Sequence, residues 1–226
     1  MSGVILTDIT DIIIMKTFRI KFEKTGLAKY ISHLDLNRLF SRSIARAGIE
    51  IAHTEGFNPR PKIVFASAIS LGMESLCEFT DIKITENLTE AEVFQKIKDI
   101  FPNGINILEV YEPKNDFKYI DRTRFHIFVK PDGFGADELK KLFEGDVFAE
   151  KKPGININLK DYILELNISI SGESQEYKLI NAVVKTNPEM YLNPENIIKA
   201  VNSKYIVDDY YIQKIEAYDK NNAIFR

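Results

Sequence analysis

Three arginines could bind phosphate groups along one face of a helix. Arg38, Arg42 and Arg46 lie four residues apart, in a segment whose apolar residues recur with the period of an α-helix. Each step of four residues advances about 6 Å along the helix axis and turns about 40°. A guanidinium group can donate two parallel hydrogen bonds to one phosphate. The spacing fits a flexible, negatively charged strand, although a solvated helix face without a ligand shows the same pattern.

A rigid basic loop is expected after this helix. Arg60 lies between Pro59 and Pro61, and each proline fixes its own φ near −65°. Such a segment loses little conformational entropy on binding. Phe57 could stack on a base and Lys62 could contact a phosphate, whereas the alternative is a plain connector with Phe57 in the core. Helix and loop together favour one anion-binding surface, formed by Arg38, Arg42, Arg46, Phe57, Arg60 and Lys62.

His33 is the candidate catalytic residue. It lies in the first turn of the predicted helix, where it could act as a general base on a ribose hydroxyl while Lys29 stabilises the phosphate. Histidines at this position also cap or pack helices, and that alternative stays open. The sequence has no HExxH, CxxC, Walker or GxGxxG motif. We therefore expect no metal site and no cofactor.

A second basic edge is possible in the C-terminal half. Arg122 and Arg124 fall on the same face of a predicted strand as His126, and that face could instead be simply solvent-exposed. In the N-terminal half, Glu74 and Glu78 follow the turn at Gly72. We expect these two carboxylates to pair with the basic loop.

The charge of the chain is uneven. The 226 residues carry a net charge of −3, yet the segment from Lys16 to Gly72 has ten basic and four acidic residues. The single cysteine, Cys77, excludes an internal disulfide and a four-cysteine metal site, and we expect it to be buried. Residues 1–15 lack the basic start of a signal peptide, and their apolar run is shorter than the ~20 residues of a membrane span. A cytoplasmic protein without membrane association is expected.

The hydrophobic patterns predict a repeated α+β architecture. In the first part, strands and helices are expected in the order strand–helix–strand–strand–helix–strand, at residues 16–22, 32–47, 62–69, 76–85, 88–101 and 105–111. This order is the split βαβ pattern of a ferredoxin-like domain. After a linker at 113–119, the second part is expected to contain strands at 123–130, 155–159, 162–170, 177–184 and 207–217, with helices at 136–144 and 194–202.

The predicted fold class is therefore α+β, with two ferredoxin-like (βαββαβ) domains in tandem, the second degenerate. The domain boundaries are an N-terminal extension at 1–15, a first ferredoxin-like domain at 16–112 that carries the basic helix and loop, and a second α+β domain at 120–226.

Four separated motifs resemble one bacterial family. They are Tyr30–Leu36, Arg46–Gly48, Gly56–Lys62 and Ser70–Ser75 with Glu78. In this order they are similar to the radical-SAM-linked (radical-SAM-associated) proteins of unknown function. The resemblance implies an accessory role in RNA or translation-related chemistry, with a radical SAM protein as partner. Because this chain has no CxxxCxxC motif, it corresponds to the standalone form. Its Thr54–Glu55 departs from the usual family pattern and places an acid beside the proposed anion site.

Three functions fit these observations. The first is a noncatalytic module that binds RNA or presents a substrate to a radical SAM enzyme, with no independent enzymatic activity. The second is a metal-independent endoribonuclease using His33, since tandem ferredoxin-like domains resemble the CRISPR RNA-processing proteins of the repeat-associated mysterious class. The third is a protein–protein adaptor whose basic loop meets an acidic partner. The sequence favours the first.

Overall fold

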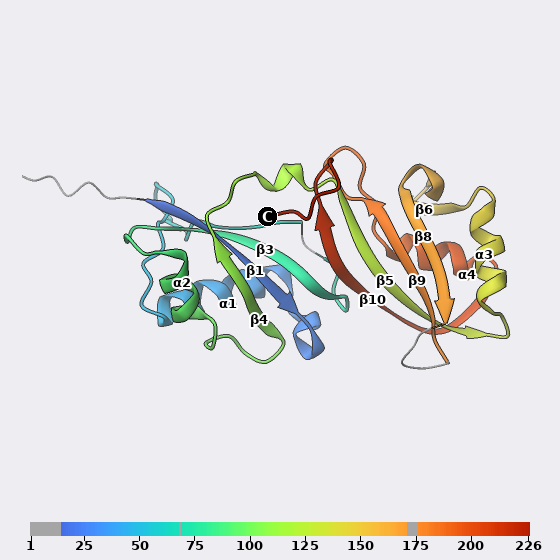
Figure 1. Cartoon of the computed structure of the whole chain (residues 1–226), viewed down its shortest axis with the longest axis horizontal. Helices are drawn as coiled ribbons and strands as arrows, with labels where there is room; N and C mark the ends of the chain where they lie inside the picture. Colours follow the sequence, from blue (N-terminus) through green and yellow to red (C-terminus); the bar gives the residue numbers. More distant parts are fainter. Residues whose placement is uncertain (1–14, 68, 171–175) are drawn as a thin grey trace, which may run out of the picture.

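The computed structural model describes residues 15–67, 69–170 and 176–226. The predicted extension lies almost wholly outside these residues. The chain forms one long eight-stranded sheet, with the strands ordered β4-β1-β3-β10-β5-β9-β8 and β2 paired to β3 beside this path. Figure 1 shows the N-terminal half on the left and the C-terminal half on the right.

The N-terminal half has the topology of a ferredoxin-like fold. Its strands follow the order β4-β1-β3-β2, and all neighbours are antiparallel. A short 3-10 helix, η1 (Gly26–Tyr30), precedes the first α-helix. The elements are β1 (Lys16–Lys24), α1 (His33–Arg46), β2 (Ile63–Phe65), β3 (Glu74–Ile84), α2 (Glu90–Ile97) and β4 (Ile105–Tyr111).

The C-terminal half repeats this topology with one insertion. Its strands follow the order β10-β5-β9-β8, the same arrangement as in the first half. The insertion is a two-stranded hairpin, β6–β7, between the first helix and the second strand of the repeat. The elements are β5 (Arg122–Asp132), α3 (Ala136–Glu144), β6 (Phe148–Lys152), β7 (Ile155–Asn158), η3 (Leu159–Asp161), β8 (Ile163–Ile170), β9 (Lys178–Lys185), α4 (Glu195–Asn202) and β10 (Ile206–Tyr218). The predicted fold class is confirmed.

Helix α1 begins where the sequence predicts. The Ser32 hydroxyl oxygen accepts a hydrogen bond from the backbone N–H of Asp35, which satisfies one of the free donors of the first turn. The helix then buries Leu36, Phe40 and Ile44 against the sheet. Because these apolar residues occupy the inner face, the arginines of α1 are left on the exposed side.

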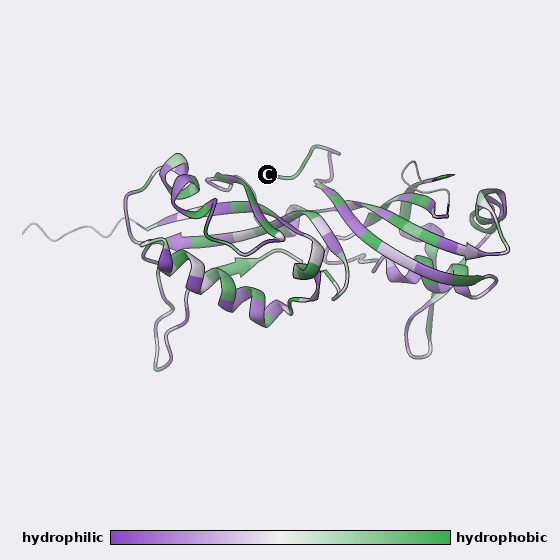
Figure 2. Cartoon of the chain, turned by 90° about the horizontal axis from the view of Figure 1, so that it is seen from below, coloured by the Kyte–Doolittle hydropathy of each residue, from purple (hydrophilic) through white to green (hydrophobic). Residues whose placement is uncertain are grey.

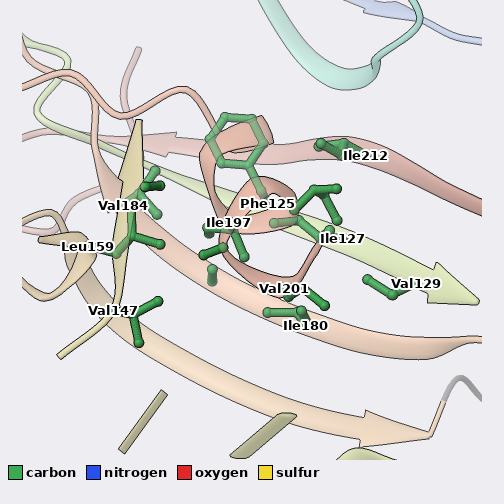
Figure 3. Close-up of a cluster of buried hydrophobic side chains, with 14 of the residues drawn as sticks. Phe125, Ile127, Val129, Val147, Leu159, Ile180, Val184, Ile197, Val201 and Ile212 are labelled. Atoms are coloured by element: carbon green, nitrogen blue, oxygen red, sulfur yellow. The ribbon is translucent and has the colours of Figure 1, made fainter. Parts of the chain in front are cut away.

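Each half has its own hydrophobic core. Helices α1 and α2 pack on one face of the first half-sheet, and α3 and α4 contribute to a separate cluster under the second. Figure 3 shows the second cluster, in which Phe125, Ile127 and Val129 of β5 point toward Ile197 and Val201 of α4. Hydrophobic and hydrophilic residues alternate along the long strands in Figure 2, as expected where one face of a sheet is covered.

The two halves are joined by parallel pairing of β3 with β10. Gln213 lies opposite Glu74, and Lys214 lies opposite Ser75. The predicted strand 62–69 is too long, because β2 ends at Phe65. Since the chain leaves the sheet there, the beginning of β3 is free to pair with β10. Among the described helices, none is both long and apolar enough to cross a membrane.

Candidate anion-binding groove

A groove of about 1240 Å³ lies in the N-terminal half. It is bordered by α1, the loop after α1, β2, β3 and the linker that follows β4. Its lining contains seven basic side chains, from Arg19, Arg38, Arg42, Arg60, Lys62, Lys83 and Lys114. The lining also has two carboxylates, Asp81 and Asp116. The local charge is therefore strongly positive in a chain whose net charge is −3.

Helix α1 supplies two exposed arginines to the groove. Arg38 Nη1 lies 3.1 Å from Asp35 Oδ1, and both side chains are well exposed, so this ion pair adds little stability. A hydrogen bond from the Ser32 hydroxyl, and then the Arg38 guanidinium, hold the pKa of Asp35 below its usual value. Within the part of the chain that the structure describes, Arg42 has no carboxylate partner. Arg42 therefore remains available to an anion.

The loop after α1 is braced as a hairpin-like turn. The Thr54 N–H donates to the Arg60 carbonyl at 2.9 Å, and the Arg60 N–H donates to the Thr54 hydroxyl at 3.0 Å. The Lys62 N–H donates to the Ala52 carbonyl at 2.7 Å. These bonds fix the backbone on both sides of Arg60, so its exposed side chain extends from a defined position into the groove.

Phe57 lies near the tip of this loop and is fully exposed. Its ring does not line the groove, and the alternative in which it packs into the core is wrong. A fully exposed phenylalanine exposes apolar surface to water at a cost in free energy. Phe57 therefore presents an exposed aromatic ring on the loop that also carries Arg60.

Arg46 does not belong to the groove. Its guanidinium donates a hydrogen bond to the backbone carbonyl of Ile100, beyond the end of α2. Steps of four residues drift about 40° around a helix, so over two steps the stripe turns away from its starting direction. The predicted surface is corrected accordingly: Arg38, Arg42, Arg60 and Lys62 converge, Arg46 faces α2, and Phe57 lies at the loop tip.

Arg19 is a buried arginine at the base of the groove that was not among the predicted site residues. Its Nε and Nη2 bond the Asp81 carboxylate at 2.7 and 2.8 Å, and its guanidinium lies 4.2 Å from the ring centre of Phe117. The side chain is almost fully buried. Strand alternation places Arg19 opposite the core residues Phe18 and Ile20, which is a usable signal. The ring centre of Phe225, near the C-terminus, lies 5.0 Å from the same guanidinium. That contact cannot be read from the sequence around Arg19.

His33 lines the groove, but its proposed catalytic partner does not. The His33 ring packs edge-on against Phe65, with 5.5 Å between ring centres. Lys29 Nζ instead lies 3.9 Å from a Glu74 carboxylate oxygen and lines a different cavity. The specific pair of His33 with Lys29 that the sequence suggested for ribose chemistry is therefore not assembled in the groove. Among the described residues, no group of three or more His, Cys, Asp or Glu side chains could hold a metal ion.

The second basic edge is neutralised by its neighbours. Arg122 Nη2 lies 2.8 Å from Asp121, and Arg124 Nη2 lies 3.0 Å from Glu165. Arg124 also donates to the Asn181 side chain at 3.0 Å. Neither arginine lines the groove. In place of a second anion-binding edge, Arg122 pairs with its preceding residue, and Arg124 of β5 bridges to Glu165 of β8 and Asn181 of β9.

Glu74 and Glu78 do not pair with the basic loop, contrary to the sequence-based expectation. Glu74 accepts the Gly26 N–H at 3.0 Å and lies near Lys29. Glu78 lies 3.0 Å from Lys214 Nζ, and both side chains are buried. The loop is therefore left without these two carboxylates.

Cys77 is buried, as predicted. Burial raises the pKa of its thiol to about 12, with Glu216 adding to the effect. The thiol is therefore protonated at neutral pH, whereas a reactive cysteine needs an accessible thiolate.

Comparison with solved structures finds distant similarities. An unknown protein from Galdieria sulphuraria is 12% identical, with 89% of this chain and 99% of that chain covered, at a TM-score of 0.28. The small subunit of acetolactate synthase from Thermotoga maritima is 14% identical, with 92% and 98% covered and the same TM-score. At these scores the likenesses say nothing about activity. No curated protein matches the chain.

A family model matches residues 17–194, which is most of the chain and includes every residue that lines the groove. Its description is "Uncharacterized protein conserved in bacteria (DUF2344)". This chain belongs to that bacterial family.

Proposed function

We propose that this chain is a noncatalytic module that binds single-stranded RNA through the groove of the N-terminal half. The observation that carries the proposal is the convergence on one groove of six basic side chains besides Arg19, which is buried against Asp81, with Asp116 as the other carboxylate of the lining. One of those carboxylates, Asp81, is already neutralised by Arg19. A polyanion would therefore gain contacts without displacing many internal ion pairs.

A flexible single strand fits this surface better than a rigid duplex. The cations come from a helix, a braced loop and a linker, and they border a concave space rather than a flat face. A single strand can follow such a path and place its bases against aromatic rings. Phe57, three residues before Arg60 in the same loop, offers an exposed ring for this purpose.

A radical SAM protein is the proposed partner, on the basis of the family resemblance described above. In this role the chain would hold an RNA, or present another substrate, while the partner carries out the chemistry. A purely protein-binding adaptor remains the competing function. Copurification of the partner that survives nuclease treatment, combined with no RNA binding by the chain alone, would favour the adaptor.

The decisive experiment is a titration of a short fluorescein-labelled RNA followed by anisotropy at several salt concentrations. If the four convergent side chains of α1 and the loop each contact a phosphate, the log–log slope of affinity against salt is about −2.8 for a single strand. The variant Arg42→Gln/Arg60→Gln removes two of these contacts, so its slope is expected near −1.4. Arg122→Gln/Arg124→Gln removes the same charge from the C-terminal half and is expected to leave the slope unchanged.

Two binding results would overturn the proposal, and a cleavage assay provides a third. One is folded wild-type protein that shows no salt-sensitive RNA binding at low ionic strength. The other is an equal loss of affinity in both double variants, because it would mean that only the net charge matters. The same samples, run on a denaturing gel, test cleavage: product that disappears in His33→Ala would establish the endoribonuclease instead.

A further inference from the structure

We propose that a second cavity, at the junction of the two halves, binds a small organic anion with an aromatic or apolar body. The cavity has a volume of about 460 Å³. That lies within the range of about 300–1,000 Å³ typical of small-molecule sites. Its walls come from both halves: Ser67 and Ile69 from the loop after β2, Phe125 from β5, and Tyr191 from the loop before α4.

The charge of the cavity selects an anion. Its lining includes two lysines, Lys118 at the surface and Lys214 in the interior, and no carboxylate among the described residues. Lys214 is 4% exposed and pairs with Glu78, which is equally buried. An anion in the cavity would therefore meet the Lys118 ammonium and the N–H groups of Lys214 that Glu78 leaves unused.

Hydrogen-bond donors are also available at the cavity wall. Of the three N–H donors of the Lys214 ammonium, one is used by Glu78 Oε1 at 3.0 Å. The Tyr191 side chain forms a hydrogen bond with Ser67. The nearby Lys214 ammonium lowers the pKa of Tyr191, although burial raises it more strongly. The Thr123 and Thr186 hydroxyls bond each other at 2.8 Å. A carboxylate or phosphate could therefore be held by an ammonium and by hydroxyl groups together.

The remaining walls are apolar and include two aromatic rings. Phe117 and Phe125 face the space, together with Ile69 and Ile120. An anion carrying a flat ring would bury its apolar part there, with the charge directed at Lys214. Phe117 is the one described residue that lines both this cavity and the RNA groove. The linker at 113–120 therefore contributes residues to both sites.

Binding can be tested on the full chain with two anionic probes and their uncharged counterparts. The probes are adenosine 5′-monophosphate against adenosine, and indole-3-acetate against indole, each followed by ligand-observed NMR and by thermal unfolding. We expect at least one anion to bind with a Kd below about 1 mM and at least tenfold more tightly than its uncharged counterpart. The two pairs distinguish a nucleotide from an aromatic carboxylate.

A matched pair of lysines on the linker separates this site from the groove. Lys118 lines the cavity and Lys114, four residues earlier, lines the groove. Lys118→Gln is expected to weaken probe binding at least threefold and to leave RNA affinity unchanged, whereas Lys114→Gln should do the opposite. Ser67→Phe fills the cavity mouth from an exposed position and should abolish probe binding in folded protein.

Three outcomes would overturn the inference. The first is that neither anionic probe binds at about 5 mM, well above the expected Kd. The second is equal binding of charged and uncharged probes. The third is probe binding that is lost in Lys114→Gln but retained in Lys118→Gln and Ser67→Phe, which would place the probe in the groove. None of these results depends on Lys214 variants, whose buried ion pair could prevent folding, and none decides whether the groove binds RNA.

Discussion

The two halves share one topology but use their basic residues in opposite ways. In the N-terminal half, Arg42 and Arg60 project into a groove without a carboxylate partner among the described residues. In the C-terminal half, Arg122 and Arg124 are held by Asp121 and Glu165. The same strand order therefore supports a binding surface in one copy and structural ion pairs in the other. Local neighbours, not topology, decide whether an arginine is available.

The connections after the first helix also differ. In the N-terminal half, a braced loop and a three-residue β2 follow α1, and they leave part of the β3 edge open. In the C-terminal half, the β6–β7 hairpin follows α3, and β8 is a full strand of eight residues. The short β2 permits β10 to join β3, so the less regular half supplies both the groove and the attachment point.

The largest expected change in stability is at the β3–β10 pairing that joins the two halves. It tests whether the two halves unfold together or independently. Removing one member of the buried pair, in Lys214→Met or Glu78→Gln, should lower the free energy of unfolding by about 3–5 kcal/mol, because the other charge is left buried. Urea unfolding measures this. The double variant should recover much of the loss. Two separate unfolding transitions, with the loss confined to one, would contradict a shared interface.

One arginine from each half can be removed to compare its contribution to stability with its contribution to RNA affinity. Arg124→Gln breaks contacts with Glu165 and Asn181 and should lower the free energy of unfolding by about 1 kcal/mol, while RNA affinity is retained. Arg42→Gln should leave stability unchanged within about 0.5 kcal/mol and lower RNA affinity about fivefold to tenfold. Urea titration and anisotropy give both values. Loss of affinity in Arg124→Gln with retention in Arg42→Gln would reverse the assignment of the two halves.

The exposed ring at the loop tip is expected to contribute to affinity and not to stability. Phe57→Ala should lower affinity for single-stranded RNA by about 1 kcal/mol or more, because a base loses its stacking partner. The melting temperature should not fall. Leu27→Ala, at another exposed apolar residue outside the groove lining, is the matched control and should bind normally. Equal RNA affinity of the two variants would show that Phe57 does not stack on a base.

Cys77 tests how tightly the β3–β10 region is closed. Because burial raises its pKa to about 12, the folded state keeps the proton that the unfolded state loses from about pH 9. Stability should therefore fall as pH rises from about 9 toward 12, and Cys77→Ala should show a weaker fall. At pH 8, a thiol reagent should modify the native chain only as fast as it unfolds. Rapid modification of native protein would show that the region is open.

The smallest effect is expected from Arg46→Gln. Its guanidinium contacts a backbone carbonyl outside the groove, so RNA affinity should change less than twofold. Anisotropy under the conditions used for Arg42→Gln provides the direct comparison. A loss as large as that of Arg42→Gln would restore Arg46 to the binding surface.

The sequence alone determined the architecture and the region of positive charge. Period-3.6 and period-2 patterns place α1 and the long strands, because they record which side of each element is buried. The Ser32 cap and the prolines around Arg60 act within a few residues, so their consequences are readable locally. Arg38, Arg42, Arg60 and Lys62 were found in this way.

Only the tertiary structure decided which charges are free. Arg19 is neutralised by Asp81, and Lys214 by Glu78, across 62 and 136 residues of sequence. Pairing of β3 with β10 depends on where β2 stops, and the cavity at the junction depends on that pairing. Ion pairs and cavities depend on atoms that lie a few ångströms apart in space. The number of residues between two groups does not predict that distance.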